Sequence, residues 1–305
     1  MVTCPLCGSG QAEPYATAYD VEYYTSDRPF EFHRCPKCDV LFISPMLHDH
    51  LDRIYPPTYY SFSEGPKTIA EQVKEYMDQR KFGRILTGIK SRDISVLDIG
   101  GGTGWLLDLI RSADSRVTST AVVDIDQAAG RVAEQRGHTY FLGRIEEYPA
   151  EGTFDLVLML NLIEHVANPK LVLRKAGQLL RPGGRLILKT PNFDSLDARL
   201  FRRRSWGGYH TPRHFVIFNR DSLVATCADC GLSPVHFSYT QGAPFWSVSL
   251  LNELKRVGLA TVSAERPAIR HPLMPWLQVL SAGFDFARRP FAKLSQMELI
   301  LERAG

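Results

Sequence analysis

Residues 96–106 read Val-Leu-Asp-Ile-Gly-Gly-Gly-Thr-Gly-Trp-Leu, and this stretch decides the fold of the chain. A short apolar run ends at Asp98, glycines follow at every second position, and an apolar stretch suited to a helix comes next. Glycine has no Cβ and accepts positive φ, so such a loop lets the backbone approach a ligand closely. In open α/β sheets, ligands lie beyond the carboxyl ends of the strands. The sequence therefore predicts a ligand-binding loop between a buried strand and a helix.

Two well-known glycine loops do not fit this stretch. The dinucleotide fingerprint Gly-x-Gly-x-x-Gly needs a third glycine where this chain has Trp105. The phosphate-binding loop needs a Gly-Lys pair followed by Ser or Thr, and none follows here. The spacing is instead Asp-x-Gly-x-Gly-x-Gly, formed by Asp98, Gly100, Gly102 and Gly104.

A second acidic residue ends the next predicted strand, about twenty residues further along the chain. Residues 121–126 read Ala-Val-Val-Asp-Ile-Asp. A carboxylate at this point can accept hydrogen bonds from both hydroxyls of a ribose. Asp124 directly follows the apolar run and is the candidate for that role. Asp126 is expected to cap the helix predicted over residues 127–136.

Four further segments continue the series along the chain. They are Gly-Arg-Ile-Glu-Glu at 143–147, Phe-Asp-Leu-Val-Leu-Met-Leu-Asn at 154–161, Ile-Glu-His-Val at 163–166 and Leu-Leu-Arg-Pro-Gly-Gly at 179–184. With these segments, residues 94–240 resemble the class I methyltransferases that depend on S-adenosylmethionine (SAM). The resemblance implies an α/β fold with a Rossmann-like, seven-stranded, mostly parallel sheet. Its last strand, predicted at residues 297–301, would be antiparallel.

The resemblance also implies how SAM is bound. The glycine loop would hold the methionine part, and Asp124 would hold the ribose. An acid often meets the adenine where this chain has Arg144, so the Ile145 N–H or the Glu146 side chain is expected there instead. His165, which opens a helix beside the cofactor, is expected to be structural. The predicted cofactor-binding residues are Asp98, Gly100, Gly102, Gly104, Asp124, Ile145, Glu146 and Asn161.

The six cysteines form three Cys-x-x-Cys pairs. Cys4, Cys7, Cys35 and Cys38 would place four thiols on two knuckles, which is the tetrahedral set that zinc prefers. Four protein ligands leave no open position, so the zinc is expected to be structural. Disulfides and a redox pair are the alternatives. Residues 23–25 and 30–33 are expected to form a hairpin between the knuckles, and Cys227 of the third pair is expected to be a buried small hydrophobe.

The composition is that of an ordinary globular protein. The chain has 305 residues, 44% hydrophobic and 23% charged, with a formal net charge of +3, which is too small to indicate nucleic acid. No apolar run reaches the length of about 18 residues that spans a bilayer. The N-terminus lacks the basic and then apolar pattern of a secretion signal, so a cytoplasmic location is expected.

The insert at residues 193–218 follows the fifth predicted strand, at the edge where class I methyltransferases build their substrate sites. Its arginines could meet a phosphate or carboxylate, or could form a solvated face. His214 is the candidate general base, because imidazole titrates near neutrality. An N-terminal zinc segment with a late histidine resembles sugar C-methyltransferases. In that family a glutamate and a tyrosine stand where this chain has Arg213 and Thr211.

Two segments flank the core motifs. Aromatic residues at 55–62 could roof the SAM site or could pack, and a helix is predicted over residues 68–89. The tail at 242–294 is apolar and aromatic, with late basic residues. Its part at 270–293 could contact a membrane surface, the core or a second copy of the chain, in which case a homodimer is expected.

The sequence therefore predicts three regions. Residues 1–62 form a small zinc-ribbon-like module with an aromatic connector, residues 63–241 form the SAM-binding core, and residues 242–305 form a helical tail with the last strand. The predicted function is methyl transfer from SAM to a small molecule, such as a sugar, a nucleotide-sugar or a glycan-linked metabolite. An RNA methyltransferase and a non-catalytic zinc-ribbon binding protein are the alternatives.

Overall fold

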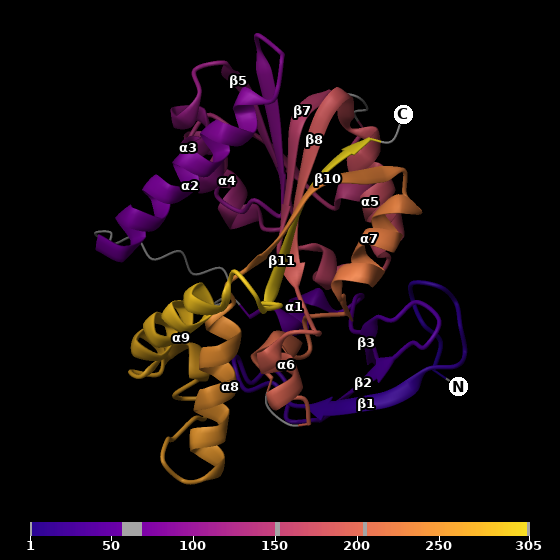
Figure 1. Cartoon of the computed structure of the whole chain (residues 1–305), viewed down its shortest axis with the longest axis vertical. Coiled ribbons are helices and arrows are strands. Elements are labelled where there is room, and N and C mark those ends of the chain that lie inside the picture. Colours follow the sequence, from indigo (N-terminus) through magenta and orange to yellow (C-terminus); the bar gives the residue numbers. More distant parts are fainter. Residues whose placement is uncertain (1, 57–68, 150–152, 204–205, 304–305) are drawn as a thin grey trace.

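A computed structural model of the chain describes residues 2–56, 69–149, 153–203 and 206–303. Its centre is a seven-stranded sheet in the order β10-β11-β8-β7-β4-β5-β6 (Figure 1). β11 is antiparallel to both of its neighbours, and the other pairs are parallel. The predicted Rossmann-like sheet with an antiparallel last strand is therefore confirmed. Its strands are β4 (Ile94–Ile99), β5 (Val117–Asp124), β6 (Thr139–Leu142), β7 (Phe154–Leu160), β8 (Leu180–Pro191), β10 (Leu232–Thr240) and β11 (Gln296–Arg303).

Helices cover both faces of this sheet (Figure 1). α2, α3 and α4 lie on one face, and α5 and α7 lie on the other. The central strands β4 and β7 are apolar almost throughout, as expected of strands that are buried on both sides. The helices are α1 (Leu51–Ile54), α2 (Ile69–Thr87), α3 (Trp105–Ala113), α4 (Gln127–Gln135), α5 (Pro169–Gln178), α6 (Leu196–Leu200), α7 (Arg220–Ala228), α8 (Ala243–Arg256) and α9 (Met274–Arg288).

A second, antiparallel sheet lies beneath the carboxyl ends of the first (Figure 1). Three of its strands come from the N-terminal segment: β1 (Glu13–Ala18), β2 (Phe30–Arg34) and β3 (Leu41–Ser44). The fourth, β9 (Val216–Ile217), comes from the insert that follows β8 and pairs with β3. Buried residues of both sheets form one hydrophobic cluster. The insert of the core therefore contributes the strand β9 to the sheet of the N-terminal segment and joins the two.

The predicted strand at residues 23–25 is wrong, because these residues lie in an irregular loop. The cause is the buried Asp20, whose carboxylate accepts hydrogen bonds from the backbone N–H of Tyr23 at 2.9 Å and of Thr25 at 2.8 Å. Backbone donors held by a side chain in this way are not free to pair with a strand. The first strand of the sheet lies earlier, at β1, whereas β2 agrees with the strand predicted at residues 30–33.

Asp20 also forms an ion pair with Arg213, which lies in the insert. The Asp20 Oδ2 and Arg213 Nη2 atoms are 3.0 Å apart, and both side chains have no exposed surface. Burial alone would raise the pKa of Asp20, but the charge and hydrogen bonds of Arg213 hold it below its usual value. Arg213 therefore binds the insert to the N-terminal segment.

The tail forms a pair of helices, α8 and α9, that stands apart from the large sheet (Figure 1). α9 and the residues that follow it leave large apolar side chains exposed, among them Trp276, Phe286 and Phe291. None of the helices in the described part of the chain is long and apolar enough to cross a membrane. The contacts predicted for residues 270–293, with a membrane surface or a second subunit, stay predictions. Most of the aromatic connector falls at residues 57–62, outside the described residues.

The substitution Asp20→Asn is expected to lower the free energy of unfolding by about 3 kcal/mol, because it leaves the buried Arg213 guanidinium without a counter-charge. Urea unfolding measures this difference. The control is Asp78→Asn, which removes an exposed ion pair with Lys74 on α2 and should change stability by less than about 1 kcal/mol. Equal losses in the two variants would show that the buried pair does not hold the N-terminal segment.

Candidate active site

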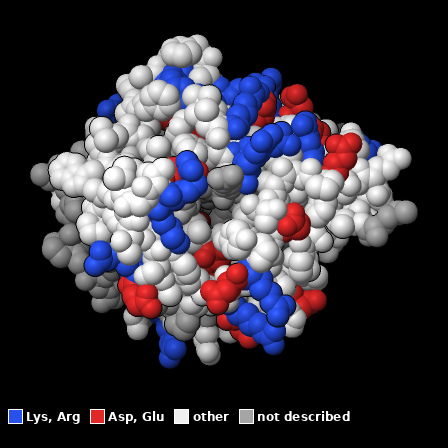
Figure 2. Space-filling model, turned by 90° about the horizontal axis from the view of Figure 1, so that it is seen from below, with Lys and Arg blue, Asp and Glu red and all other residues white. Residues whose placement is uncertain are grey.

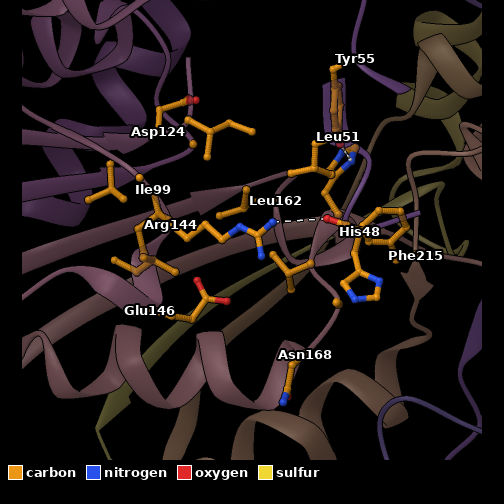
Figure 3. Close-up of a pocket in the computed structure, with 18 of the residues that line it drawn as sticks. His48, Leu51, Tyr55, Ile99, Asp124, Arg144, Glu146, Leu162, Asn168 and Phe215 are labelled. Atoms are coloured by element: carbon orange, nitrogen blue, oxygen red, sulfur yellow. Dashed lines mark hydrogen bonds between the residues drawn. The ribbon is translucent and has the colours of Figure 1, made fainter. Parts of the chain in front are cut away.

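A cavity of about 370 Å³ lies where β4, β5 and β7 end, between the large sheet and the N-terminal segment (Figure 3). Figure 3 shows Asp124 and Ile99 on one side of it and Tyr55, His48 and Phe215 on the other. Five of the predicted cofactor-binding residues line it: Gly100, Asp124, Ile145, Glu146 and Asn161. The lining also includes His48, Leu51 and Tyr55 of the N-terminal segment, together with His165 and Phe215.

The glycine loop has the backbone that its sequence predicts. Gly100, Gly102 and Gly104 have φ angles of 77°, 53° and 71°, in the region that favours glycine. A Cβ at Gly104 would lie 2.4 Å from the ring of His138, and one at Gly100 would lie 3.1 Å from Leu162. Only glycine fits at these positions. Of the three, Gly100 lines the cavity.

The two strand-ending acids have different surroundings. The Asp124 carboxylate lines the cavity and accepts hydrogen bonds from the N–H of Gly102 at 2.9 Å and of Asp126 at 3.1 Å. Asp98 is buried beneath the loop, and its carboxyl group fills the space that a Cβ on Gly101 would need. Burial and the nearby Asp124 charge raise the pKa of Asp98 to about 8. Asp98 therefore supports the loop from below, and Asp124 faces the ligand space.

Arg144 extends across the cavity, and its Nη2 donates a hydrogen bond to the carbonyl oxygen of His48 at 3.3 Å (Figure 3). The loop after β6 thereby contacts the N-terminal segment. Ile145 and Glu146, in the short helical turn that follows, remain at the cavity wall.

Asn161 directly follows β7 and has a φ of 54°, a conformation that is uncommon outside glycine and is found most often at functional sites. Its Oδ1 accepts a hydrogen bond from Gln296 Nε2 at 3.0 Å. A residue of β11 thereby holds the Asn161 side chain at the cavity wall.

Histidines cluster at the end of the cavity nearest the insert. His165 lines the cavity, with its Nδ1 2.8 Å from the Tyr55 hydroxyl and 3.1 Å from the carbonyl oxygen of Arg213. His214 lies behind it, buried, with the two ring centres 4.6 Å apart. Burial lowers the pKa of His165 to about 3 and that of His214 well below its usual value.

Two histidines line the cavity, His48 and His165. His165 was expected to be structural, and the base role predicted for His214 stays a prediction. The wall residue His48 was missed, because only tertiary packing brings the N-terminal segment over the sheet. Tyr55 belongs to the aromatic connector that was expected either to roof the site or to pack, and it lines the cavity. The sequence did offer a signal for His165 at the cavity: the Glu-His pair at 164–165 lies in the short turn that follows β7, a strand that ends at the site.

Arg199 and Arg202 of the insert line a second, polar cavity of about 430 Å³. Arg199 is paired with Asp194 at 2.5 Å, and Arg202 lies 4.1 Å from the centre of the Tyr15 ring. On the face seen from below, basic and acidic side chains are interspersed around a hollow (Figure 2). The insert thus presents partly neutralised arginines, without a surface of a single charge on that face.

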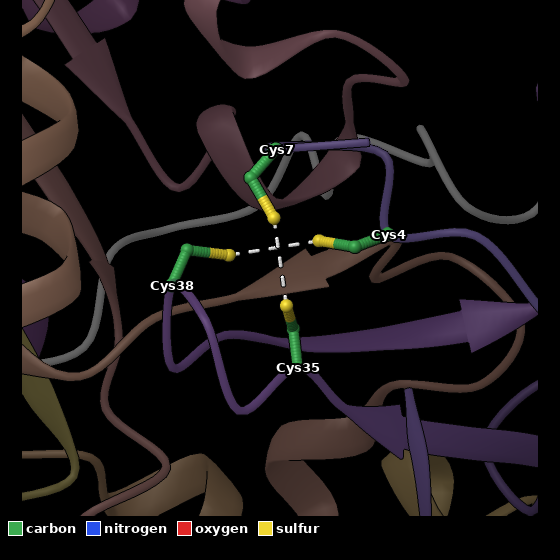
Figure 4. A group of neighbouring side chains, drawn as sticks. All are labelled: Cys4, Cys7, Cys35 and Cys38. Carbon is green, nitrogen blue, oxygen red and sulfur yellow. Dashed lines mark hydrogen bonds between the residues drawn. The ribbon is translucent and has the colours of Figure 1, made fainter. Parts of the chain in front are cut away.

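The four predicted metal ligands converge (Figure 4). The Sγ atoms of Cys4 and Cys38 are 3.6 Å apart, those of Cys7 and Cys35 are 3.5 Å apart, and all four lie within 4.8 Å of one another. In each knuckle, the residue after the second cysteine donates its N–H to the carbonyl of the first at 2.9 Å. These two residues, Gly8 and Asp39, both have positive φ. The third pair is separate, and its Cys227 is buried in α7, as expected.

Comparison with known proteins matches a family model described as "Methyltransferase domain" to residues 69–236, more than half of the chain. A ubiquinone biosynthesis O-methyltransferase of Bordetella avium (strain 197N) is 29% identical over 154 residues, which are 46% of this chain and 62% of that protein. One from Parvibaculum lavamentivorans is 31% identical over 183 residues, 55% of this chain and 71% of that protein. The chain thus spans less than two thirds of the Bordetella protein.

Among solved structures, one similar fold is that of Burkholderia thailandensis 1,6-didemethyltoxoflavin-N1-methyltransferase, with bound 1,6-didemethyltoxoflavin and S-adenosylhomocysteine. The TM-score is 0.50, and the match covers 96% of this chain and 100% of that chain. The sequence identity is 16%, so the likeness concerns the fold alone.

Proposed function

Because this chain belongs to the methyltransferase-domain family, we propose that it transfers the methyl group of SAM to a small-molecule acceptor. The observation that carries the proposal is the cavity beyond β4 and β5, with the glycine loop at its edge and the Asp124 carboxylate in its wall. These are the two features that hold a nucleoside ligand at the carboxyl edge of an α/β sheet.

The residues of the cavity fit SAM. Each carboxylate oxygen of Asp124 accepts one backbone hydrogen bond and keeps a lone pair that a ribose hydroxyl can use. Gly100 would border the methionine part, and Ile145 and Glu146 would meet the adenine. Asn161 would lie at the methyl-donor end, and Asp98, Gly102 and Gly104 would shape the loop.

When bound, SAM supplies an activated methyl group on its sulfonium. The chain's own residues would position the acceptor for in-line attack and exclude water. Positioning of this kind can account for much of an acceleration, since effective molarities reach about 10⁵ M or more. The side chains that would contact the acceptor include three residues of the cavity lining, Tyr55, His165 and Phe215.

We further propose a sugar, nucleotide-sugar or glycan-linked metabolite as the acceptor. The second cavity supports this choice, because Arg202 and Arg220 line it and could bind a phosphate or carboxylate. Three carboxylates share its wall, those of Asp39, Asp194 and Asp221. A phenolic acceptor is the second candidate. The apolar wall formed by Leu51, Tyr55 and Phe215 favours it, and the curated relatives are named for ubiquinone biosynthesis. RNA is less favoured, because charges of both signs share the face seen in Figure 2.

For the N-terminal segment we propose one structural zinc ion, bound by Cys4, Cys7, Cys35 and Cys38. Four sulfurs at about 2.3 Å from a tetrahedral zinc lie about 3.8 Å from one another. The separations of 3.5 and 3.6 Å need little adjustment to reach this value. A closed set of four protein ligands stabilises the fold and leaves no position for substrate.

The substitution Asp124→Asn is expected to weaken the binding of S-adenosylhomocysteine about tenfold to a hundredfold, because hydrogen bonds to a charged acceptor are lost. Isothermal titration calorimetry gives the affinities. Asp126→Asn is the matched control, since Asn still caps α4 and its affinity should equal that of the wild type. Unchanged binding in a folded Asp124→Asn protein would refute the ribose role.

The substitution Cys35→Ser is expected to remove one equivalent of bound zinc and to lower the melting temperature, because three ligands hold the metal less firmly than four. Metal analysis after gel filtration measures the loss. Cys230→Ser changes the pair outside the cluster and should keep the full metal content. Equal zinc in both variants would contradict the assignment.

An acceptor screen with radiolabelled SAM separates the candidate functions. Label is expected in nucleotide-sugars or free glycans, and the reaction should be lost in Asp124→Asn. Label in phenolic acids alone would favour the second candidate. Label in ribosomal RNA, with binding that falls steeply as salt rises, would replace both with RNA methylation.

A further inference from the structure

Glu164, His165 and His214 form a cluster that the proposed methyl transfer does not use. Glu164 and His165 lie in the 3₁₀ turn Ile163–His165 after β7, and His214 lies in the insert just before β9. One potential ligand atom from each of the three lies within 4.8 Å of the other two. The cluster contains no cysteine and is separate from the four-sulfur set.

The Glu164 carboxylate is fully buried and only half satisfied. Its Oε2 accepts a hydrogen bond from Thr190 Oγ1 at 2.9 Å. Its Oε1 has no hydrogen-bond partner among the described residues and lies 4.0 Å from His214 Nε2. A buried polar atom without a partner is costly, so native proteins rarely keep one unless something binds it.

The backbone fixes the tautomer of His214. Its Nδ1 lies 2.8 Å from the carbonyl oxygen of Gly208, which only accepts, so Nδ1 carries the proton and Nε2 keeps its lone pair. His165 Nδ1 lies 2.8 Å from the Tyr55 hydroxyl and 3.1 Å from the carbonyl oxygen of Arg213, and donation to that carbonyl would leave its Nε2 free to bind a metal in the same way. A histidine that binds a metal is commonly oriented in this way, by donating its other N–H to a backbone carbonyl.

We propose that Glu164, His165 and His214 bind a divalent transition-metal ion. Two imidazoles and one carboxylate are donors that suit zinc, iron or cobalt better than calcium or magnesium. Two ligands at about 2.0 Å from a tetrahedral ion lie about 3.3 Å apart. The Glu164 and His214 atoms therefore need to close by less than an ångström from the 4.0 Å observed.

The ion would lie at the edge of the cavity, because His165 is part of the cavity wall. Three protein ligands leave a coordination position for water or for an oxygen of the acceptor. That second role rests on the proposed function and favours an acceptor whose reacting group is a hydroxyl or a neighbour of one. In this arrangement His214 is a metal ligand and is not the general base.

Metal counting tests the site without any acceptor. Wild-type protein equilibrated with Zn²⁺ and freed of excess by gel filtration is expected to hold two equivalents by elemental analysis. Glu164→Gln and His214→Asn should each hold one. His210→Asn is the matched control, because His210 is packed 4.9 Å from the His214 ring but is outside the ligand set, and it should hold two.

Cobalt(II) identifies which site an ion occupies. Thiolate charge-transfer absorption reports the cysteine site and should persist in Glu164→Gln, which also shows that the variant is folded. The weaker bands of a nitrogen and oxygen site should disappear. If His214→Asn fails to fold, His165→Asn at the cavity wall replaces it.

Two outcomes would overturn the proposal: a wild type that holds no ion beyond the cysteine site, or two equivalents retained in both Glu164→Gln and His214→Asn. Failure of the methyl-transfer proposal is separate, since Asp124→Asn should lose S-adenosylhomocysteine binding and still hold two ions.

Discussion

The structure depends on the contacts between residues 213–217 and the N-terminal segment. Arg213 pairs with Asp20 in the interior, and β9 then adds a strand to the N-terminal sheet. Separating the pair would leave a buried charge without a counter-charge, which costs free energy. The contact therefore favours one arrangement of the N-terminal segment on the large sheet. The cavity follows from that arrangement, because the large sheet supplies one wall and the N-terminal segment supplies the other.

The same segment links the two proposed ligand sites. The Arg213 side chain forms an ion pair with Asp20, and its carbonyl oxygen lies beside His165 Nδ1. The Nε2 atom of the neighbouring His214 lies 4.0 Å from Glu164 Oε1. On the far side of the cavity, Arg144 reaches the backbone of His48. Residues from distant parts of the sequence therefore hold one another across the ligand space. A change in the N-terminal segment should be felt at the cavity even where it touches no ligand.

The sequence was informative where local chemistry decides the structure. The glycine loop, the strand-ending acids and the cap at Asp126 need particular residue types, and each lies where the pattern put it. The seven-stranded sheet was implied by the resemblance to class I methyltransferases, and the apolar runs before Asp124 and Asn161 lie in its strands β5 and β7. Most of what was missed concerns contacts between distant segments. The β9 pairing, the Asp20–Arg213 ion pair and the Tyr55–His165 contact join residues about 100 to 200 positions apart, which no periodicity reports. The strand expected at residues 23–25 failed for a local reason, because the Asp20 carboxylate holds their backbone N–H groups.

The order of strands in the large sheet also constrains how the chain can be assembled during synthesis. β11 is the last strand to be made, yet it lies between β8 and β10. β10 pairs with no other strand in that sheet, and α8 and α9 are synthesised between β10 and β11. The backbone N–H and C=O groups of β10 therefore have no strand partner during this interval of translation. An unpaired strand is a template for aggregation, and pairing distant in sequence is slow. Chaperone binding during translation should therefore concentrate on the interval between β10 and β11.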